Sequence, residues 1–135
     1  PQGAREISVD VLCSPNREEY TSIKFYRHGL FAFNQNGRGL HQDALVLDTS
    51  RSSLLPDVKS RPPEVAPFEL GDGELLKLQV FIDKSVVEVF ANHRQCLALR
   101  VYPEREDSLG VSIRAQGCDA VLRSLDAWKM TRIWD

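Results

Sequence analysis

Two carboxylates close together in the sequence, Asp83 and Glu88, are the residues whose types and spacing come nearest to a reaction centre. A pair of carboxylates can act as acid and nucleophile in the cleavage of a glycosidic bond. The spacing argues against this use, because Asp83 falls in a predicted turn and Glu88 lies about 16 Å further along an extended strand. The pair therefore predicts no catalytic centre.

Glu88 has two other interpretations, which follow from the strands around it. Residues 75–82, 86–92 and 95–102 predict a meander of three strands. If the first loop has three residues and the second has two, Glu88 is the sole polar member of an apolar face. A carboxylate in such a face needs a cation or hydrogen-bond donors. The hypotheses are a contact with a ligand or another domain, or a buried ion pair with one of the available cations, which are Arg100, Arg114 and Arg123.

The other residue types that can carry chemistry lack the spacing that it requires. No Gly-x-Ser-x-Gly segment supports a Ser/His/Asp triad. The histidines occupy separate turns or strand ends, so we expect no metal site and no cofactor. An odd number of cysteines without a Cys-x-x-Cys spacing predicts a buried, inert thiol at each position. These residues are His28, His41, His93, Cys13, Cys96 and Cys118.

The length and charge of the chain argue against several classes of protein. Its 135 residues correspond to a single domain with a core of its own. The formal net charge of -2 argues against binding to nucleic acid or to anionic lipid. No stretch approaches the roughly 18 apolar residues of a membrane span. We therefore expect a soluble domain with no nucleic-acid partner and no membrane partner.

Alternation of apolar and polar residues with period two recurs along the chain and predicts an all-β fold. Eight or so short strands favour an antiparallel two-sheet β-sandwich over a closed barrel. His28 and Gly29 predict a turn between the second and third strands, and residues 120–130 predict a last strand that closes the sheet. The expected strands cover residues 5–13, 20–26, 30–33, 41–49, 75–82, 86–92, 95–102, 109–115 and 120–130.

Residues 50–67 interrupt this alternation. Serines and prolines such as Pro56, Pro62 and Pro63 cannot sustain a strand ladder, so we expect a long irregular connection. Two roles stay open for it. It can cover the edge of a sheet, or it can form a binding loop.

Several segments together carry a family resemblance. Residues 81–92, Phe-Ile-Asp-Lys-Ser-Val-Val-Glu-Val-Phe-Ala-Asn, followed by Leu-Arg-Val-Tyr-Pro at 99–103, resemble the signature of the C-terminal β-sandwich of glycoside hydrolase family 32. Residues 13–15, 47–53 and 124–130 resemble further pieces of that family in the same order. The resemblance spans nearly the whole chain and implies a jelly-roll or lectin-like sandwich.

The resemblance also implies a parent enzyme of the invertase, levanase or inulinase type. Such an enzyme is a retaining β-fructofuranosidase whose N-terminal five-bladed propeller holds the active site. The propeller's Asn-Asp-Pro, Arg-Asp-Pro and Glu-Cys motifs do not occur in this sequence, so no catalytic residue is carried over. We expect residues 1–135 to be a non-catalytic fragment of a larger propeller-plus-sandwich glycosidase. One sheet face and residues 50–67 would pack on the propeller.

Two further expectations follow from the resemblance. Family sandwiches begin with one or more strands before the piece at residues 5–13, so the chain is expected to lack its first strand or strands. Related sandwiches also act as fructan-binding modules, in which Asp, Glu and Arg side chains meet a fructose ring. Asp83, Glu88 and Arg100 are therefore the candidate residues for a carbohydrate or interdomain contact. A fructan or fructose ligand and a homodimer stay open as partners.

Overall fold

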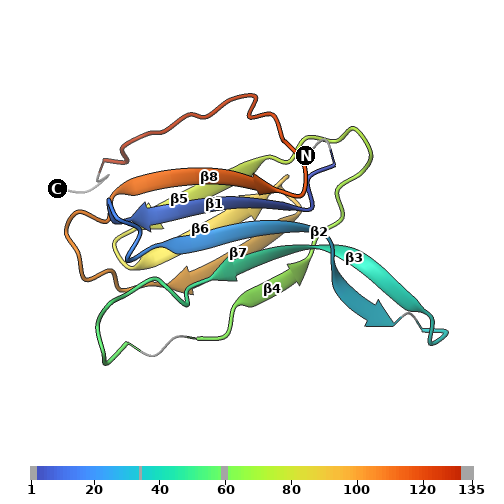
Figure 1. Cartoon of the computed structure of the whole chain (residues 1–135), viewed down its shortest axis with the longest axis horizontal. Helices are drawn as coiled ribbons and strands as arrows, with labels where there is room; N and C mark the ends of the chain where they lie inside the picture. Colours follow the sequence, from blue (N-terminus) through green and yellow to red (C-terminus); the bar gives the residue numbers. More distant parts are fainter. Residues whose placement is uncertain (1–2, 34, 59–60, 132–135) are drawn as a thin grey trace.

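The computed structural model describes residues 3–33, 35–58 and 61–131, which fold into strands, turns and irregular segments without a helix. Antiparallel strands form two sheets that stack as two layers (Figure 1). The larger sheet has the order β4-β3-β2-β1-β8 and the smaller has the order β5-β6-β7. This is the two-sheet β-sandwich that the alternation predicts. The strands are β1 (Glu6–Cys13), β2 (Thr21–Phe33), β3 (Gly39–Asp48), β4 (Glu64–Pro67), β5 (Leu78–Asp83), β6 (Val86–Ala91), β7 (Gln95–Arg100) and β8 (Gly110–Gln116).

The core lies between the two layers and consists of the apolar residues that alternate along the strands. Phe25 of β2 is fully buried, and its ring meets the edge of Phe68 with 6.1 Å between centroids. Burying one large apolar side chain contributes about 1.5–3 kcal/mol. The core cluster comprises Val11, Ile23, Phe25, Leu45, Leu47, Ala66, Phe68, Leu70, Val87, Val89, Ala91, Leu97 and Val101.

The strand β2 is continuous, whereas the sequence predicts two strands joined by a turn at His28 and Gly29. The expected turn is a β-bulge, at which the register with β3 shifts between Tyr26 and Leu30. The backbone N–H of His28 donates to the Asp43 carboxylate on β3 at 2.9 Å. Because this bond holds the bulge against its neighbour, the strand continues instead of reversing. The far part of the β2–β3 hairpin projects beyond the sandwich (Figure 1).

The connection between residues 50 and 67 ends in a strand that the sequence does not predict. β4 pairs with β3, and Pro67 lies opposite Ala44. β4 is the edge strand of its sheet, where the missing N–H of proline removes no essential ladder bond. The last residues of the connection therefore cover the edge of β3. Its other proposed role, as a binding loop, stays a prediction.

The strands β5, β6 and β7 form the predicted meander, but its two loops have the opposite lengths. Lys84 and Ser85 alone join β5 to β6, and residues 92–94 join β6 to β7. Val87 is therefore fully buried, and Glu88 points to the exposed side. The predicted place of Glu88 in the apolar face is wrong, because a one-residue shift moves every side chain of a strand to the other face.

Residues 120–130 form no strand, contrary to the prediction. This tail follows β8 along the open side of the sandwich (Figure 1) and has no ladder partner among the described residues. Leu125 and Trp128 are 64% and 83% exposed. Val111 of β8 is also exposed. The tail therefore alternates apolar and polar residues, but none of the described strands pairs with it.

Candidate functional site

The structure places Asp83, Glu88 and Arg100 on one face of the smaller sheet, the face turned away from the core. Val86 lies between Asp83 and Arg100 in the ladder, and Phe81 lies opposite Glu88. The three charged side chains are exposed, and none forms a side-chain hydrogen bond or ion pair within residues 3–33, 35–58 and 61–131. The predicted candidates are thus gathered on one surface and available to a partner.

We call this surface the outer face. It combines these charges with apolar side chains, since the rings of Phe81 and Phe90 meet edge to face with 5.8 Å between centroids. Neither of the two cavities described below is lined by a residue of the outer face. Aromatic residues and arginine are enriched in protein interfaces, so this open sheet surface is a candidate interface. The outer face consists of Gln79, Phe81, Asp83, Val86, Glu88, Phe90, Cys96, Ala98 and Arg100.

The β5–β6 hairpin brings Asp83 and Glu88 closer together than their spacing in an extended chain suggests. Asp83 lies opposite Val86, so Glu88 is its diagonal neighbour on the same face. Diagonal neighbours are typically about 7–8 Å apart. The expected separation is therefore wrong, because the chain folds back between the two residues. Both carboxylates are exposed and neither lines one of the two cavities described below, so the geometry gives no support to a catalytic pair.

The buried ion pair proposed for Glu88 is also wrong. Glu88 is exposed on β6, and two of its proposed partners lie elsewhere. Arg114 bonds to Asp10 on the larger sheet, and Arg123 lies in the exposed tail. Arg100 alone shares the outer face with Glu88.

A second cluster, which the sequence did not reveal, surrounds Asp10 on the larger sheet. Its Oδ2 accepts hydrogen bonds from Nη2 of Arg17 at 2.8 Å and Nη2 of Arg114 at 3.1 Å. Its Oδ1 accepts from Ser22 Oγ at 2.5 Å. Burial raises the pKa of Asp10, but the hydroxyl and the two guanidinium groups outweigh it and hold the pKa below its ordinary value. The guanidinium of Arg17 also lies over the ring of Tyr20, 4.6 Å from its centroid.

The fully buried carboxylate of Glu19 joins three loops. Its Oε2 accepts from the backbone N–H groups of Leu54 at 3.1 Å and Glu104 at 2.8 Å. Its Oε1 accepts from the backbone N–H of Arg105 at 3.2 Å and from Ser108 Oγ at 2.6 Å. Burial raises the pKa of Glu19, but these donors together lower it below its ordinary value. In the sequence, Glu19 is one charge in the polar run that follows β1, and no motif marks it.

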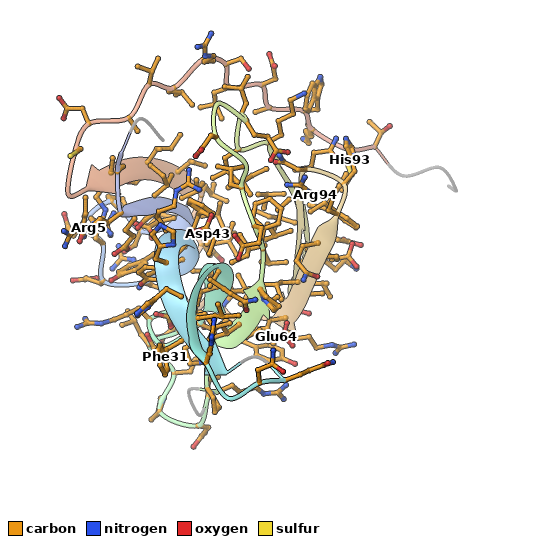
Figure 2. All side chains as sticks on the ribbon, turned by 90° about the vertical axis from the view of Figure 1, so that its right-hand side faces the viewer. Arg5, Phe31, Asp43, Glu64, His93 and Arg94 are labelled. Carbon is orange, nitrogen blue, oxygen red and sulfur yellow. The ribbon has the colours of Figure 1, made fainter. Side chains whose placement is uncertain are left out.

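Asp43, like Glu19, is a buried carboxylate that joins separate segments of the chain, and it lies between the two layers (Figure 2). Its fully buried carboxylate accepts hydrogen bonds from Arg27 Nη1 at 2.8 Å and from the backbone N–H groups of His28 at 2.9 Å and Leu70 at 3.1 Å. These bonds connect the β2 bulge to the chain that follows β4. Sequence reasoning missed Asp43, because a carboxylate within a strand carries no signal of burial.

Among the cavities in the surface of the described residues are two of about 270 Å³ each. The first lies at the β6–β7 turn, which carries His93 and Arg94 (Figure 2). Arg94 Nη1 forms an ion pair with Glu74 Oε1 at 3.0 Å. It is lined by Glu74, Leu75, Lys77, Asn92 and His93. The second lies between the turn after β1 and the start of β8. It is lined by Cys13, Ser14, Pro15, Arg17, Asp107, Gly110, Val111 and Ser112.

The cysteines differ from one another, contrary to the expectation of three buried thiols. Cys13 is buried, and burial raises its pKa. Cys96 and Cys118 are exposed, because Cys96 faces outward from β7 and Cys118 follows β8 on the open side of the sandwich. Among the described residues, no group of three or more His, Cys, Asp or Glu side chains is arranged to hold a metal ion.

Comparison with known proteins connects this fold to a family. The family model described as glycosyl hydrolases family 32 C terminal matches residues 1–129. The insoluble β-fructofuranosidase isoenzyme CWINV1 of Arabidopsis thaliana is 38% identical over 103 residues, which are 76% of this chain and 17% of the relative. The levanase of Bacillus subtilis is 28% identical over 134 residues, which are 97% of this chain and 19% of the relative. The chain thus spans less than a fifth of these relatives.

A solved structure supports the fold. The crystal structure of fructan 1-exohydrolase IIa from Cichorium intybus matches 73% of this chain and 17% of its own chain, with a TM-score of 0.57 and 24% identity. At this level of identity the likeness concerns the fold alone.

Proposed function

Because the chain belongs to the family of C-terminal domains of family 32 glycosyl hydrolases, we propose that it is the non-catalytic β-sandwich of an enzyme that hydrolyses β-fructofuranosidic bonds in sucrose or fructans. The observation that carries this proposal is the family match over residues 1–129. Relatives named β-fructofuranosidase and levanase support the substrate class. Under this proposal the catalytic groups lie in the part of the parent polypeptide that the chain does not cover, an N-terminal five-bladed propeller.

The outer face is the surface through which the domain packs on that catalytic part. Asp83, Glu88 and Arg100 have no side-chain partner in the described part of the chain, so a complementary surface can pair them without breaking an existing bond. The exposed Phe81 supplies an aromatic anchor of the kind that dominates interface energies. In the assembled enzyme this packing would stabilise the catalytic part and fix its orientation.

Charge reversal on the outer face tests the packing. We expect Glu88→Lys to leave the melting temperature of residues 1–135 unchanged, because Glu88 is exposed and unpaired there. In the full parent enzyme the same change should lower the melting temperature by several degrees, since it places a lysine against an interface built for a carboxylate. Asp72→Lys, in an exposed turn, is the matched control. Equal melting temperatures for all three parent proteins would contradict this docking surface.

The alternative function is a fructan-binding module that uses the same residues. Two unpaired carboxylates and a guanidinium beside the exposed ring of Phe81 favour it, because sugars combine hydroxyl groups with an apolar ring face. Calorimetric titration of residues 1–135 with fructose, levan and inulin tests this alternative. Heat that disappears in Glu88→Gln would support it, and absence of heat at about 1 mM ligand would exclude useful affinity.

A further inference from the structure

The second cavity has the lining of a small ligand site, and it lies on neither the outer face nor the core. It is open to solvent between residues 13–17, which are the end of β1 and the turn after it, and residues 107–112, which lead into β8 and include its start. Its volume of about 270 Å³ lies just below the roughly 300–1,000 Å³ of typical ligand pockets. A cavity of this size suits a single sugar ring better than a larger molecule.

Arg17 lines the cavity, and its guanidinium is a fixed hydrogen-bond donor. Its Nη2 is bonded to the fully buried Asp10 at 2.8 Å, and its guanidinium lies over the ring of Tyr20. Its backbone N–H donates to the Ser14 carbonyl at 3.0 Å, which closes the turn that carries it. A guanidinium has five N–H donors, so the Asp10 bond leaves others for a ligand. Because the side chain is already held, little conformational entropy would be lost on binding.

Asp107 and Ser112 supply the complementary groups. The Asp107 carboxylate is held by Nε and Nη2 of Arg105 at 2.7 and 2.6 Å, and these bonds lower the pKa of Asp107, so it stays an ionised acceptor. The Ser112 hydroxyl has no hydrogen-bond partner within the described part of the chain. It is therefore available both to donate and to accept.

The combination of charged, hydroxyl and apolar groups in the lining indicates which class of ligand the cavity can bind. Val111 and Pro15 give the cavity an apolar part of its wall, beside the charged and hydroxyl groups. A sugar ring presents hydroxyl groups at its edge and C–H groups on its face, and it can satisfy a fixed donor, a fixed acceptor and a hydroxyl at once. A phosphate or carboxylate would have to share Arg17 with the Asp10 carboxylate and would lie beside Asp107, whose own charge is paired with Arg105, so a neutral hydroxylated ring suits the lining better.

We propose that this cavity is a binding subsite for one sugar ring. In it Arg17 donates a hydrogen bond to the ring, Asp107 accepts one, and the Ser112 hydroxyl forms a further hydrogen bond that fixes the position of the ring. The identity of that ring as a fructosyl unit rests on the proposed function, whereas its polyhydroxylated character rests on the cavity alone. A subsite of this kind would hold a neighbouring part of a fructan chain against the sandwich.

The test is titration of residues 1–135 with 1-kestose, a fructose-containing trisaccharide, and with maltotriose, which contains only glucose. We expect saturable binding of 1-kestose. Loss of one neutral hydrogen bond in Ser112→Ala should weaken it about 2- to 10-fold, and Arg17→Ala should weaken it further. Ser124→Ala and Arg123→Ala, both in the exposed tail, are the matched controls and should bind like the unmodified chain. A thermal melt of each variant verifies folding, which matters for Arg17→Ala because Asp10 loses a partner.

The outcomes distinguish failure of the sugar subsite from failure of the proposed function. Equal binding of both trisaccharides, weakened by Ser112→Ala, would keep the sugar subsite and contradict its assignment to fructosyl units. Binding that is lost in Glu88→Gln but kept in Ser112→Ala would place the site on the outer face and overturn this proposal. Absence of saturable binding of either sugar up to about 10 mM would also overturn it.

Discussion

Replacement of Glu19 by alanine should destabilise the domain more than any change of an exposed carboxylate. Its fully buried side chain accepts four hydrogen bonds, from Leu54, Glu104, Arg105 and Ser108. A hydrogen bond to a charged group contributes about 1.5–3 kcal/mol, but bonds that share one carboxylate do not add fully. We therefore expect Glu19→Ala to lower the free energy of unfolding by about 3–5 kcal/mol, a large part of the roughly 7–20 kcal/mol expected for a chain of this length.

Urea unfolding measures this loss, with equal slopes in the two proteins as the sign that the same surface is exposed. Thermal unfolding should show a fall of about 10–20 °C in the melting temperature. Glu18→Ala is the matched control, because Glu18 is the neighbouring acid and its ion pair with Arg105 is exposed, so no measurable change is expected. A loss below about 1 kcal/mol in Glu19→Ala would refute the role of Glu19 in joining the three loops.

Two further predictions concern the same buried carboxylates. Because the pKa of Glu19 is lower in the folded chain than its ordinary value of 4.5, its ionised form adds stability above that value, and this stability is lost as the pH falls. In urea unfolding from pH 7 to pH 3, the unmodified chain should therefore lose more stability than Glu19→Gln, and parallel pH profiles would contradict the assignment. Asp43→Ala should lower the free energy of unfolding by about 3–5 kcal/mol, because it leaves Arg27 and two backbone N–H groups without their acceptor. Urea unfolding measures this loss. The control Asp72→Ala should unfold at the same urea concentration as the unmodified chain.

Most of the strands, though not β4, could be predicted from the sequence because period-two alternation is a direct consequence of the strand geometry. The faces of the β5–β7 meander could not, because they depend on the length of two loops. Lys84, Asn92 and His93 adopt positive φ angles of 51°, 47° and 55° in these loops. No glycine marks these positions, so the sequence carries no signal for the turn length. The misplacement of Glu88 follows from this single ambiguity.

The candidate residues Asp83, Glu88 and Arg100 came from the family resemblance, and their role stays a prediction. Asp83, Glu88 and Arg100 share one face, although the register first assigned to Glu88 was wrong. The clusters around Glu19 and Asp43 were not predicted, since each joins segments far apart in the sequence. The acceptor Glu19 and its donor Ser108, for example, are 89 residues apart. Such contacts arise only when the sandwich has brought its loops together.

The tail shows the opposite case, in which a correct local pattern does not produce a strand. Residues 120–130 alternate as a strand should, yet Trp128 is 83% exposed. Strand formation needs a neighbouring ladder, and the tail has none among the described residues. Local alternation therefore predicts which side chains could share a face, and the surrounding layers decide whether the strand forms.

The central claim, that this chain is the non-catalytic sandwich of a fructoside-hydrolysing enzyme, is tested most directly by an assay of sucrose and levan hydrolysis. The assay compares purified residues 1–135 with the full parent polypeptide at equal molar concentration. We predict hydrolysis by the parent and none above the buffer rate by residues 1–135. Hydrolysis that stays with residues 1–135 through a second purification, or a parent that cleaves neither substrate, would contradict the claim.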